Sequence, residues 1–265
     1  MASTSETGHA INVANFEDLI SYCIGYGGSY NPVKLALQIV AMQGLRTTAQ
    51  GNIQNVNAFA VALINVINAR QLAFDPLKAL ATRIVNALDA TNATDELVKD
   101  AKTINRKIQG ARKTTATTPN PTDPTNPVPP VPPVPPPGPN PIPTPVPPTP
   151  QQISVSQQSY DSLLENFNRL ILLVASEPTY TPNEVDLQVA TLTGLAATLA
   201  VQNTAVINAT TNLSNARITR DTTLYAPNTG LYDIQLEVKK YVKSVFGASS
   251  QQYRQVSRIK FTKPR

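Results

Sequence analysis

The sequence contains very few of the residues that usually build enzyme active sites. It has one cysteine, Cys23, one histidine, His9, and no tryptophan among 265 residues. A single cysteine cannot form an intramolecular disulfide, which excludes a disulfide-stapled secreted module. One cysteine and one histidine cannot supply a zinc site of Cys and His ligands. A Ser-His-Asp or Cys-His centre would have to use His9, which we place in a disordered N-terminal segment, residues 1–10.

Charged residues are scarce as well. They make up 15% of the chain, whereas about 25% is usual in a globular domain. The 22 Lys and Arg exceed the 17 Asp and Glu by five, so the formal net charge is +5. Asn, Gln, Ser and Thr supply much of the remaining polarity. A surface with so few charges repels its own copies weakly, which permits self-association.

Targeting signals are not recognisable in this sequence. The N-terminus has no basic segment followed by an apolar one, as a signal peptide would. Apolar stretches such as Leu192–Val201 are shorter than the roughly 20 residues that span a bilayer. We therefore expect a cytoplasmic protein without a transmembrane segment. Non-classical export, or assembly outside the cell, stays open.

Proline is concentrated in one segment, since 18 of the 24 prolines lie between Pro119 and Pro150. Proline lacks the N–H donor and fixes φ, so this segment is excluded from helices and central strands, and polyproline II is expected. At about 3.1 Å per residue, it reaches on the order of 100 Å when fully extended. We interpret residues 114–152 as a linker that holds two domains apart. The alternative, a ligand for an aromatic groove, stays open.

The sequences on either side of this linker follow one pattern, over residues 11–113 and 153–263. Each has a tyrosine–proline turn, Tyr30–Pro32 or Tyr180–Pro182, and then a long helix-forming run with the tripeptide Asn-Ala-Arg near its end. Each run breaks at an aromatic residue followed two positions later by proline. The matching order indicates a tandem duplication. Two shorter helices close each copy, at 77–89 and 95–108, and at 232–246 and 251–259.

The long runs have the periodicity of helices. Stepping alternately by four and three residues from Leu35 to Phe74, ten of twelve positions are apolar: 35, 39, 42, 46, 49, 53, 56, 60, 63, 67, 70 and 74. The second run has a comparable stripe at Val185, Val189, Leu192, Ala196, Leu199, Val206 and Leu213. About 40 helical residues would span about 60 Å. The patterns predict an all-α protein of two tandem, elongated up-down bundles, each of about four helices, joined by the polyproline II linker.

Two arginines occupy equivalent places, Arg70 and Arg217, at the ends of the two long stripes. As functional residues they would contact an anion or a partner. As structural residues they would pair with nearby carboxylates, such as Asp75 and Asp221, or cap the last carbonyls of a helix. We favour the structural interpretation.

The C-terminal part of each copy is basic. Residues 238–265 contain eight Lys or Arg, no Asp or Glu, and four interleaved Tyr or Phe. Such a pattern can bind nucleic acid or another polyanion through counterion release and stacking. The candidate contacts are Lys239, Lys240, Lys243, Arg254, Arg258 and Lys260. Basic residues are also common at helix C-termini and on solvated helix faces, so this function is our second choice.

Asparagines recur along both long helices, and catalytic motifs do not. Asn52, Asn55, Asn57, Asn65 and Asn68 lie in the first helix, and Asn203, Asn208, Asn212 and Asn215 in the second. Amide side chains can join helices or specify partners, or form an uncharged solvated face. The glycine-rich stretch Gly25–Gly28 lacks the Lys-Ser/Thr of a phosphate loop. We predict no enzyme, no metal and no cofactor.

Several short segments resemble a group of uncharacterised helical proteins from Bacteroidota. They are Tyr241–Gly247, Gln252–Val256 and Ile259–Phe261 near the C-terminus, and Ala81–Leu88 with Asn105–Gly110 in the first copy. The resemblance implies a duplicated helical-bundle protein and carries no activity, cofactor or site residue. The sequence as a whole therefore predicts a non-enzymatic scaffold that makes protein–protein contacts through its long helices. Such a protein would bind a partner or assemble with itself into an elongated particle or filament.

Overall fold

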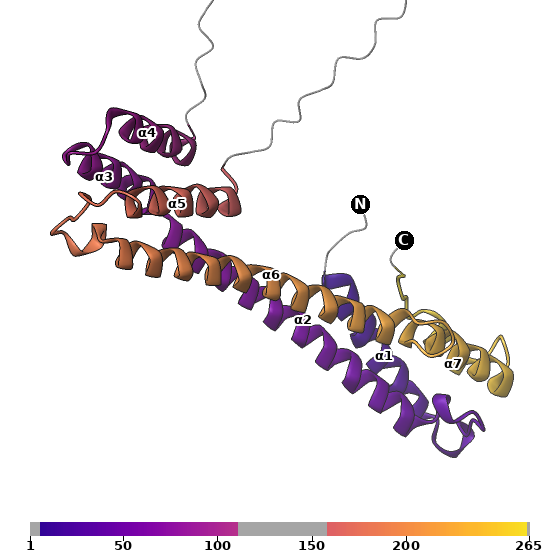
Figure 1. The fold of residues 1–265 in the computed structure, drawn as a ribbon. Coiled ribbons are helices and arrows are strands. Elements are labelled where there is room, and N and C mark those ends of the chain that lie inside the picture. The colour runs from indigo at the N-terminus through magenta and orange to yellow at the C-terminus, as the bar shows by residue number, and fades with distance from the viewer. Residues whose placement is uncertain (1–5, 111–157, 264–265) are drawn as a thin grey trace, which may run out of the picture. The chain divides into compact units, whose positions relative to one another are not determined.

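The computed structural model describes residues 6–110 and 158–263, which form helices and turns without any strand (Figure 1). The all-α prediction is confirmed for this part of the chain. In chain order the elements are α1 (Glu6–Gly25), the 3-10 turns η1 (Gly27–Ser29) and η2 (Leu35–Leu37), α2 (Ile39–Phe74), α3 (Leu77–Asp89), α4 (Asp95–Gln109), α5 (Tyr160–Ala175), the 3-10 turn η3 (Val185–Leu187), α6 (Val189–Tyr225), α7 (Leu231–Phe246) and α8 (Gln251–Ser257).

The shorter helices lie where the sequence places them. The bounds of α3 are those predicted, and α4, α7 and α8 differ by two residues or fewer at any end. The long helices instead begin seven residues after the prolines that were expected to start them. Before each long helix a tyrosine hydroxyl holds the chain in a turn: Tyr30 donates to the Leu37 carbonyl at 2.8 Å, and Tyr180 to the Leu187 carbonyl at 3.0 Å.

The apolar stripe predicted for the first long helix is the face that it buries. All its positions from Ile39 to Phe74 are buried or half-buried, whereas Leu35 lies in η2 and is 73% exposed. The stripe of α6 behaves alike from Val189 onward, and Val185 in η3 is 67% exposed. Helix periodicity therefore identified the inner faces of both long helices.

The described residues form two compact units that differ from the two predicted bundles. Unit 1 combines residues before Pro76 with residues after Ala197, and unit 2 is Pro76–Ala197. Each unit thus contains helices from both sides of the proline-rich segment. The physical reason is helix pairing: α1 packs against α7 and α8, and α4 packs against α5. The proline-rich linker itself lies outside the described residues.

Unit 1 has a core built from distant parts of the chain. Phe16 and Leu19 of α1 and Met42 of α2 are fully buried, and they share one cluster with the buried residues Leu231, Ile234, Val238 and Val242 of α7. Tyr30 packs edge-on against Tyr241, with ring centroids 5.3 Å apart. Burial of these apolar side chains is the main stabilising term, at about 1.5–3 kcal/mol each.

The core of unit 2 is built from side chains of α3, α4, α5 and the first residues of α6. Its fully buried side chains are apolar: Leu77, Ala81, Ile84 and Leu88 of α3, Ala101 and Ile108 of α4, Phe167, Leu170 and Val174 of α5, and Leu192 of α6. Helix α4 is well capped. The Thr94 hydroxyl accepts from the Leu97 N–H, two acidic residues open the helix, and Gly110 ends it in the left-handed conformation.

The N-terminal segment is more ordered than the sequence suggested. Helix α1 begins at Glu6, so residues 6–10, expected to be disordered, are helical. His9 is only 6% exposed, and its Nδ1 lies 2.8 Å from the Tyr225 hydroxyl. The N-terminal turn is polar in sequence but packs against a distant helix end, which composition cannot reveal.

Two helical stretches are long and apolar enough to cross a membrane by length and composition. They are Ile39–Asp89, with a mean hydropathy of 1.2 in its most apolar window, and Val189–Tyr225, with 1.3. The sequence argument from Leu192–Val201 considered uninterrupted apolar runs and missed them. Long core helices pass the same test, so segment length does not decide where either helix lies.

Candidate functional site

In unit 1, α2 and the part of α6 after Ala197 run antiparallel (Figure 1). Asn52 of α2 donates to the Thr223 hydroxyl of α6 at 2.8 Å. Next to this bond is a hollow of about 240 Å³, lined by Asn52, Asn55 and Phe59 of α2 and by Asn212, Asn215, Ala216 and Thr219 of α6. The sequence analysis offered amides that join helices as one interpretation, and Asn52 does so.

Helix α2 carries a second, exposed stripe, each member of which directly follows a member of the buried stripe, so that it lies about 100° around the helix from it. Gln50, Gln54, Asn57, Val61, Ile64 and Asn68 step alternately by four and three residues and are all exposed. Val61 is 58% exposed and Ile64 is 56% exposed. No residue between Arg46 and Arg70 is charged. This α2 outer stripe has the spacing of a coiled-coil seam, with amides among apolar side chains.

Helix α6 has an outer stripe of the same kind within unit 1. Its exposed members are Thr204, Ile207, Thr211, Ser214 and Ile218, again at alternate three- and four-residue steps. The hydroxyls of Thr204 and Thr211 donate to carbonyls four residues earlier, at 3.0 and 3.1 Å. These two threonine hydroxyls are satisfied within the helix and need no polar partner outside it.

The predicted polyanion residues divide into engaged and exposed side chains. Lys239 donates to the Ile259 carbonyl at 2.6 Å and lies over the Phe261 ring at 5.0 Å. Burial also lowers the pKa of Lys239. Its ammonium is thus engaged within unit 1, and its role as a polyanion contact stays a prediction. Lys243 is exposed and lies over the Tyr253 ring at 5.7 Å.

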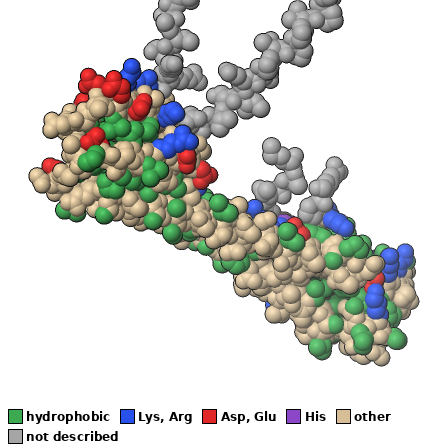
Figure 2. Space-filling view, viewed as in Figure 1, with side chains coloured by type: hydrophobic (Ala, Val, Ile, Leu, Met, Phe, Trp, Pro, Cys, Tyr) green, Lys and Arg blue, Asp and Glu red, His purple; other side chains and the backbone are tan. Residues whose placement is uncertain are grey.

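The other predicted contacts, Lys240, Arg254, Arg258 and Lys260, are exposed in the described part of the chain. Figure 2 shows blue Lys and Arg side chains gathered over the α7 end of unit 1. Five of the six predicted side chains are thus exposed, and we refer to them as the basic surface. The surface over α2 and α6 in this view is by contrast mostly uncharged (Figure 2).

Asparagines of α1 hold the C-terminal residues of this basic surface. Asn12, which is 1% exposed, donates to the Thr262 carbonyl at 2.7 Å and accepts from the Thr262 N–H at 3.0 Å. Asn15 donates to the Lys260 carbonyl at 2.7 Å. The sequence analysis did not single out these two asparagines. Their three-residue spacing places them on one face, but only the fold shows which chain they bind.

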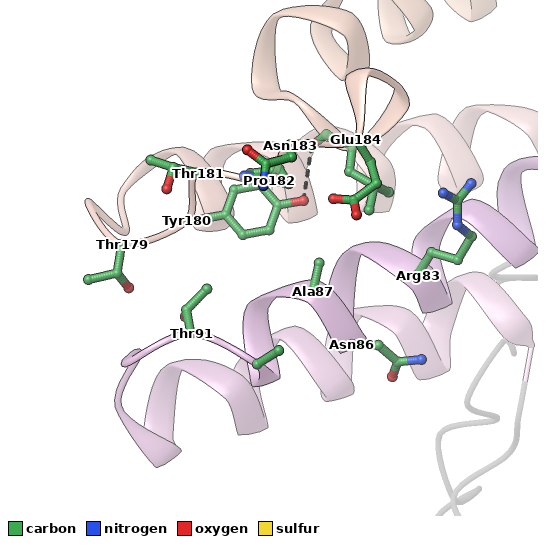
Figure 3. A pocket seen from close by; sticks show the side chains of 12 residues that line it. Arg83, Asn86, Ala87, Thr91, Thr179, Tyr180, Thr181, Pro182, Asn183 and Glu184 are labelled. Atoms are coloured by element: carbon green, nitrogen blue, oxygen red, sulfur yellow. Dashed lines mark hydrogen bonds between the residues drawn. The ribbon is translucent and has the colours of Figure 1, made fainter.

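Unit 2 has an open hollow of about 510 Å³ between α3 and the segment that precedes α6 (Figure 3). Tyr180 and Ala87 face each other across it, and Arg83, Asn86 and Glu184 lie at its rim. The Tyr180 hydroxyl is used by the Leu187 carbonyl, and burial raises its pKa to about 12. Arg83 forms an ion pair with Asp186 that holds the pKa of that carboxyl below its usual range. The Tyr180 hydroxyl and the Arg83 guanidinium are thus both engaged in contacts within unit 2.

The two equivalent arginines are half-buried on α2 and α6. Asp221, the carboxylate suggested for Arg217, pairs with its neighbour Arg220 at 2.8 Å, and the Arg220 side chain is 6% exposed. Charge pairing at this place in α6 therefore includes an arginine that the sequence analysis did not name. The described residues contain no group of three or more His, Cys, Asp or Glu placed to hold a metal ion.

Comparisons of the chain with protein-family models, with curated proteins and with solved structures found no match. The resemblance to helical proteins of Bacteroidota therefore stays a prediction. What the protein does has to be inferred from its surfaces.

Proposed function

We propose that this protein is a non-enzymatic structural protein that associates with copies of itself through its long helices. The observation that supports this function is the α2 outer stripe. Exposed apolar residues at coiled-coil spacing usually face another helix, and amides at such positions select register and partner. The partner we infer is the same stripe of a second copy, because an uncharged surface offers no electrostatic barrier to its own copy.

Sedimentation velocity over a range of concentrations tests this proposal. The wild-type chain should form species larger than the monomer as concentration rises. The double variant Val61→Asp with Ile64→Asp should remain monomeric at concentrations at which the wild type associates, because it places charge at the centre of the stripe. Val33→Asp is the matched control, since Val33 is 96% exposed and lies in the turn before η2, away from the stripe. A wild-type chain that stays monomeric at every concentration excludes the proposal.

A second candidate function is polyanion binding by the basic surface of unit 1. It is favoured by the exposed cations at Lys240, Arg254, Arg258 and Lys260, which come from α7, α8 and the residues after them. Retention on a heparin column should be lost in a variant with Lys240, Arg254 and Arg258 changed to Glu. The Lys99→Glu variant, altered at an exposed lysine of α4, is the control and should be retained. A wild-type chain that is not retained excludes this function.

A further inference from the structure

Each compact unit is assembled from both halves of the chain, residues 6–110 (half 1) and residues 158–263 (half 2). In unit 1, α1 and α2 of half 1 pack with α7 and α8 of half 2. In unit 2, α3 and α4 of half 1 pack with α5 and η3 of half 2. Neither half alone contains a complete core for either unit. The surface between the halves is therefore a recognition surface within the folded chain.

The two halves use equivalent residues in the two units. Tyr30 and Tyr180 each donate to the carbonyl seven residues later, so the turns that contain η2 and η3 align on these two tyrosines. Helices α3 and α7 align on their first residues, Leu77 and Leu231. Their buried positions then match in pairs: Leu77 with Leu231, Ala81 with Gln235, Ile84 with Val238, and Leu88 with Val242. The halves are thus similar enough that a half could in principle pair with a second copy of itself instead of with the other half.

The charges at one equivalent position distinguish the halves. In unit 1, Lys34 of half 1 pairs with Glu237 of half 2 at 2.5 Å. In unit 2, Arg83 of half 1 pairs with Asp186 of half 2, and Glu184 also attracts it. By the two alignments, Lys34 corresponds to Glu184 and Arg83 corresponds to Glu237. Half 1 therefore carries the cation in both units, and half 2 carries the anion.

This arrangement disfavours the pairing of like halves. Two copies of half 1 would bring Lys34 against Arg83, and two copies of half 2 would bring Glu184 and Asp186 against Glu237. Like charges are repelled, whereas the pairing of half 1 with half 2 gains an attraction at both sites. The side chains are exposed, so each site contributes only a several-fold preference.

We infer that half 1 and half 2 form a heterotypic recognition pair, and that half 1 of one copy can bind half 2 of another copy. The inference rests on the proposed self-association, because it names a second contact between copies. Such pairing closes as a dimer where two copies exchange halves reciprocally, and it extends into an open chain where each copy binds two different neighbours. Within one chain the halves are covalently joined, which keeps their effective concentration high. Pairing between copies is therefore expected at high protein concentration.

A full-length chain with a specific protease site in residues 114–152, cut after folding, tests the recognition pair. We expect the two fragments to stay together as one particle with the helical signal of the uncut chain. When an isotope-labelled and an unlabelled cut preparation are mixed, native mass spectrometry should show labelled half 1 with unlabelled half 2. Fragments that separate after cutting, or like halves that pair as often as unlike halves, overturn the inference.

Charge exchange supplies the matched control. Changing Lys34 and Arg83 to Glu should lower the fraction of unlike pairs several-fold in the mixed cut preparations. Adding Glu184→Lys, Asp186→Lys and Glu237→Lys should restore it, because the same positions then carry the opposite order of charges. Circular dichroism confirms that each variant is helical. An unchanged fraction in the first variant overturns the role of these charges.

Intact copies separate this inference from the proposed function. Two intact preparations, one carrying a donor and one an acceptor dye, are incubated together at high concentration and diluted. Energy transfer that persists in Val61→Asp with Ile64→Asp shows half-to-half pairing between copies without the α2 outer stripe. If the wild-type chain associates in sedimentation but the double variant shows no energy transfer, the half-to-half inference is overturned while the proposed function stands.

Discussion

The side-chain amide of Gln158 donates to the carbonyl oxygen of Lys107 at 3.0 Å, although the whole proline-rich segment separates the two residues. The same glutamine accepts from the Lys78 ammonium at 3.0 Å. The residues that flank segment 111–157 on either side therefore meet in unit 2. A spacer that holds two bundles apart would join different bodies, and here the flanks join one. The interpretation of residues 114–152 as a spacer between two bundles stays a prediction, because those residues lie outside the described part of the chain.

Shortening this segment should leave the fold intact. Replacing residues 111–157 by about six Gly and Ser residues should raise the free energy of unfolding by about 2 kcal/mol, because a shorter loop costs less entropy to close. Urea denaturation followed by circular dichroism measures the change. A Gly/Ser segment of the original length is the control and should leave stability near that of the wild type. Loss of helical signal in the short variant would contradict the proximity of Lys107 and Gln158.

Two glycines should respond oppositely to alanine. Gly110 has φ of +76°, and a β-carbon there would lie 2.7 Å from the Gln158 side chain. Gly110→Ala should lower the free energy of unfolding by about 1–2 kcal/mol. Gly51 lies inside α2 in open space, so Gly51→Ala should raise it by up to about 1 kcal/mol. Chemical denaturation measures both, and equal effects would refute the assignment of Gly110 to a left-handed cap.

The two turn tyrosines should contribute similarly. Tyr30→Phe and Tyr180→Phe each leave a carbonyl without its donor, and the two tyrosines are only 6% and 5% exposed. Each change should cost about 1–2 kcal/mol in thermal or urea unfolding. Tyr22→Phe, at a residue 39% exposed on α1, is the control and should cost little. A large loss of stability in only one of these two variants would argue against equivalent turns.

Cys23 should make the free energy of unfolding depend on pH in the alkaline range. Burial raises the pKa of its thiol to about 12, above its ordinary value. The unfolded thiol ionises first as pH rises through about 9, so the unfolded state binds fewer protons and stability falls. Urea midpoints should therefore decrease from pH 8 to 10, and less steeply in Cys23→Ala. A thiol reagent at pH 8 should modify the single cysteine only after denaturation.

Neighbouring lysines of α7 should differ in their contribution to stability. Lys239→Met removes the donor to the Ile259 carbonyl, whereas Lys240→Met changes an exposed side chain. The first should lower the free energy of unfolding by about 1–3 kcal/mol, and the second by less than about 0.5 kcal/mol. Thermal denaturation distinguishes them. Equal stability of the two variants would contradict a stabilising role for Lys239 and leave it as a candidate contact of the basic surface.

The candidate site was partly readable from the sequence. The asparagines that line the hollow between α2 and α6 were singled out by their recurrence, and Asn52 bonds Thr223 as an interhelical amide should. The basic residues were found by counting, but counting cannot separate Lys239, which binds a carbonyl, from Lys240, which is exposed. Nor can it detect His9 or Asn12, which lie near the start of the chain and bond Tyr225 and Thr262 near its end.

The sequence by itself determined the helices, their inner faces and most of their boundaries. These properties depend on residues three or four apart and on local caps and prolines, so periodicity contains the information. Only the tertiary structure decided which helices share a core. Two similar halves can bury their stripes within themselves or against each other, because both pairings satisfy the same pattern of apolar residues. That choice depends on side-chain fit and on ion pairs such as Lys34 with Glu237, between residues far apart in the chain.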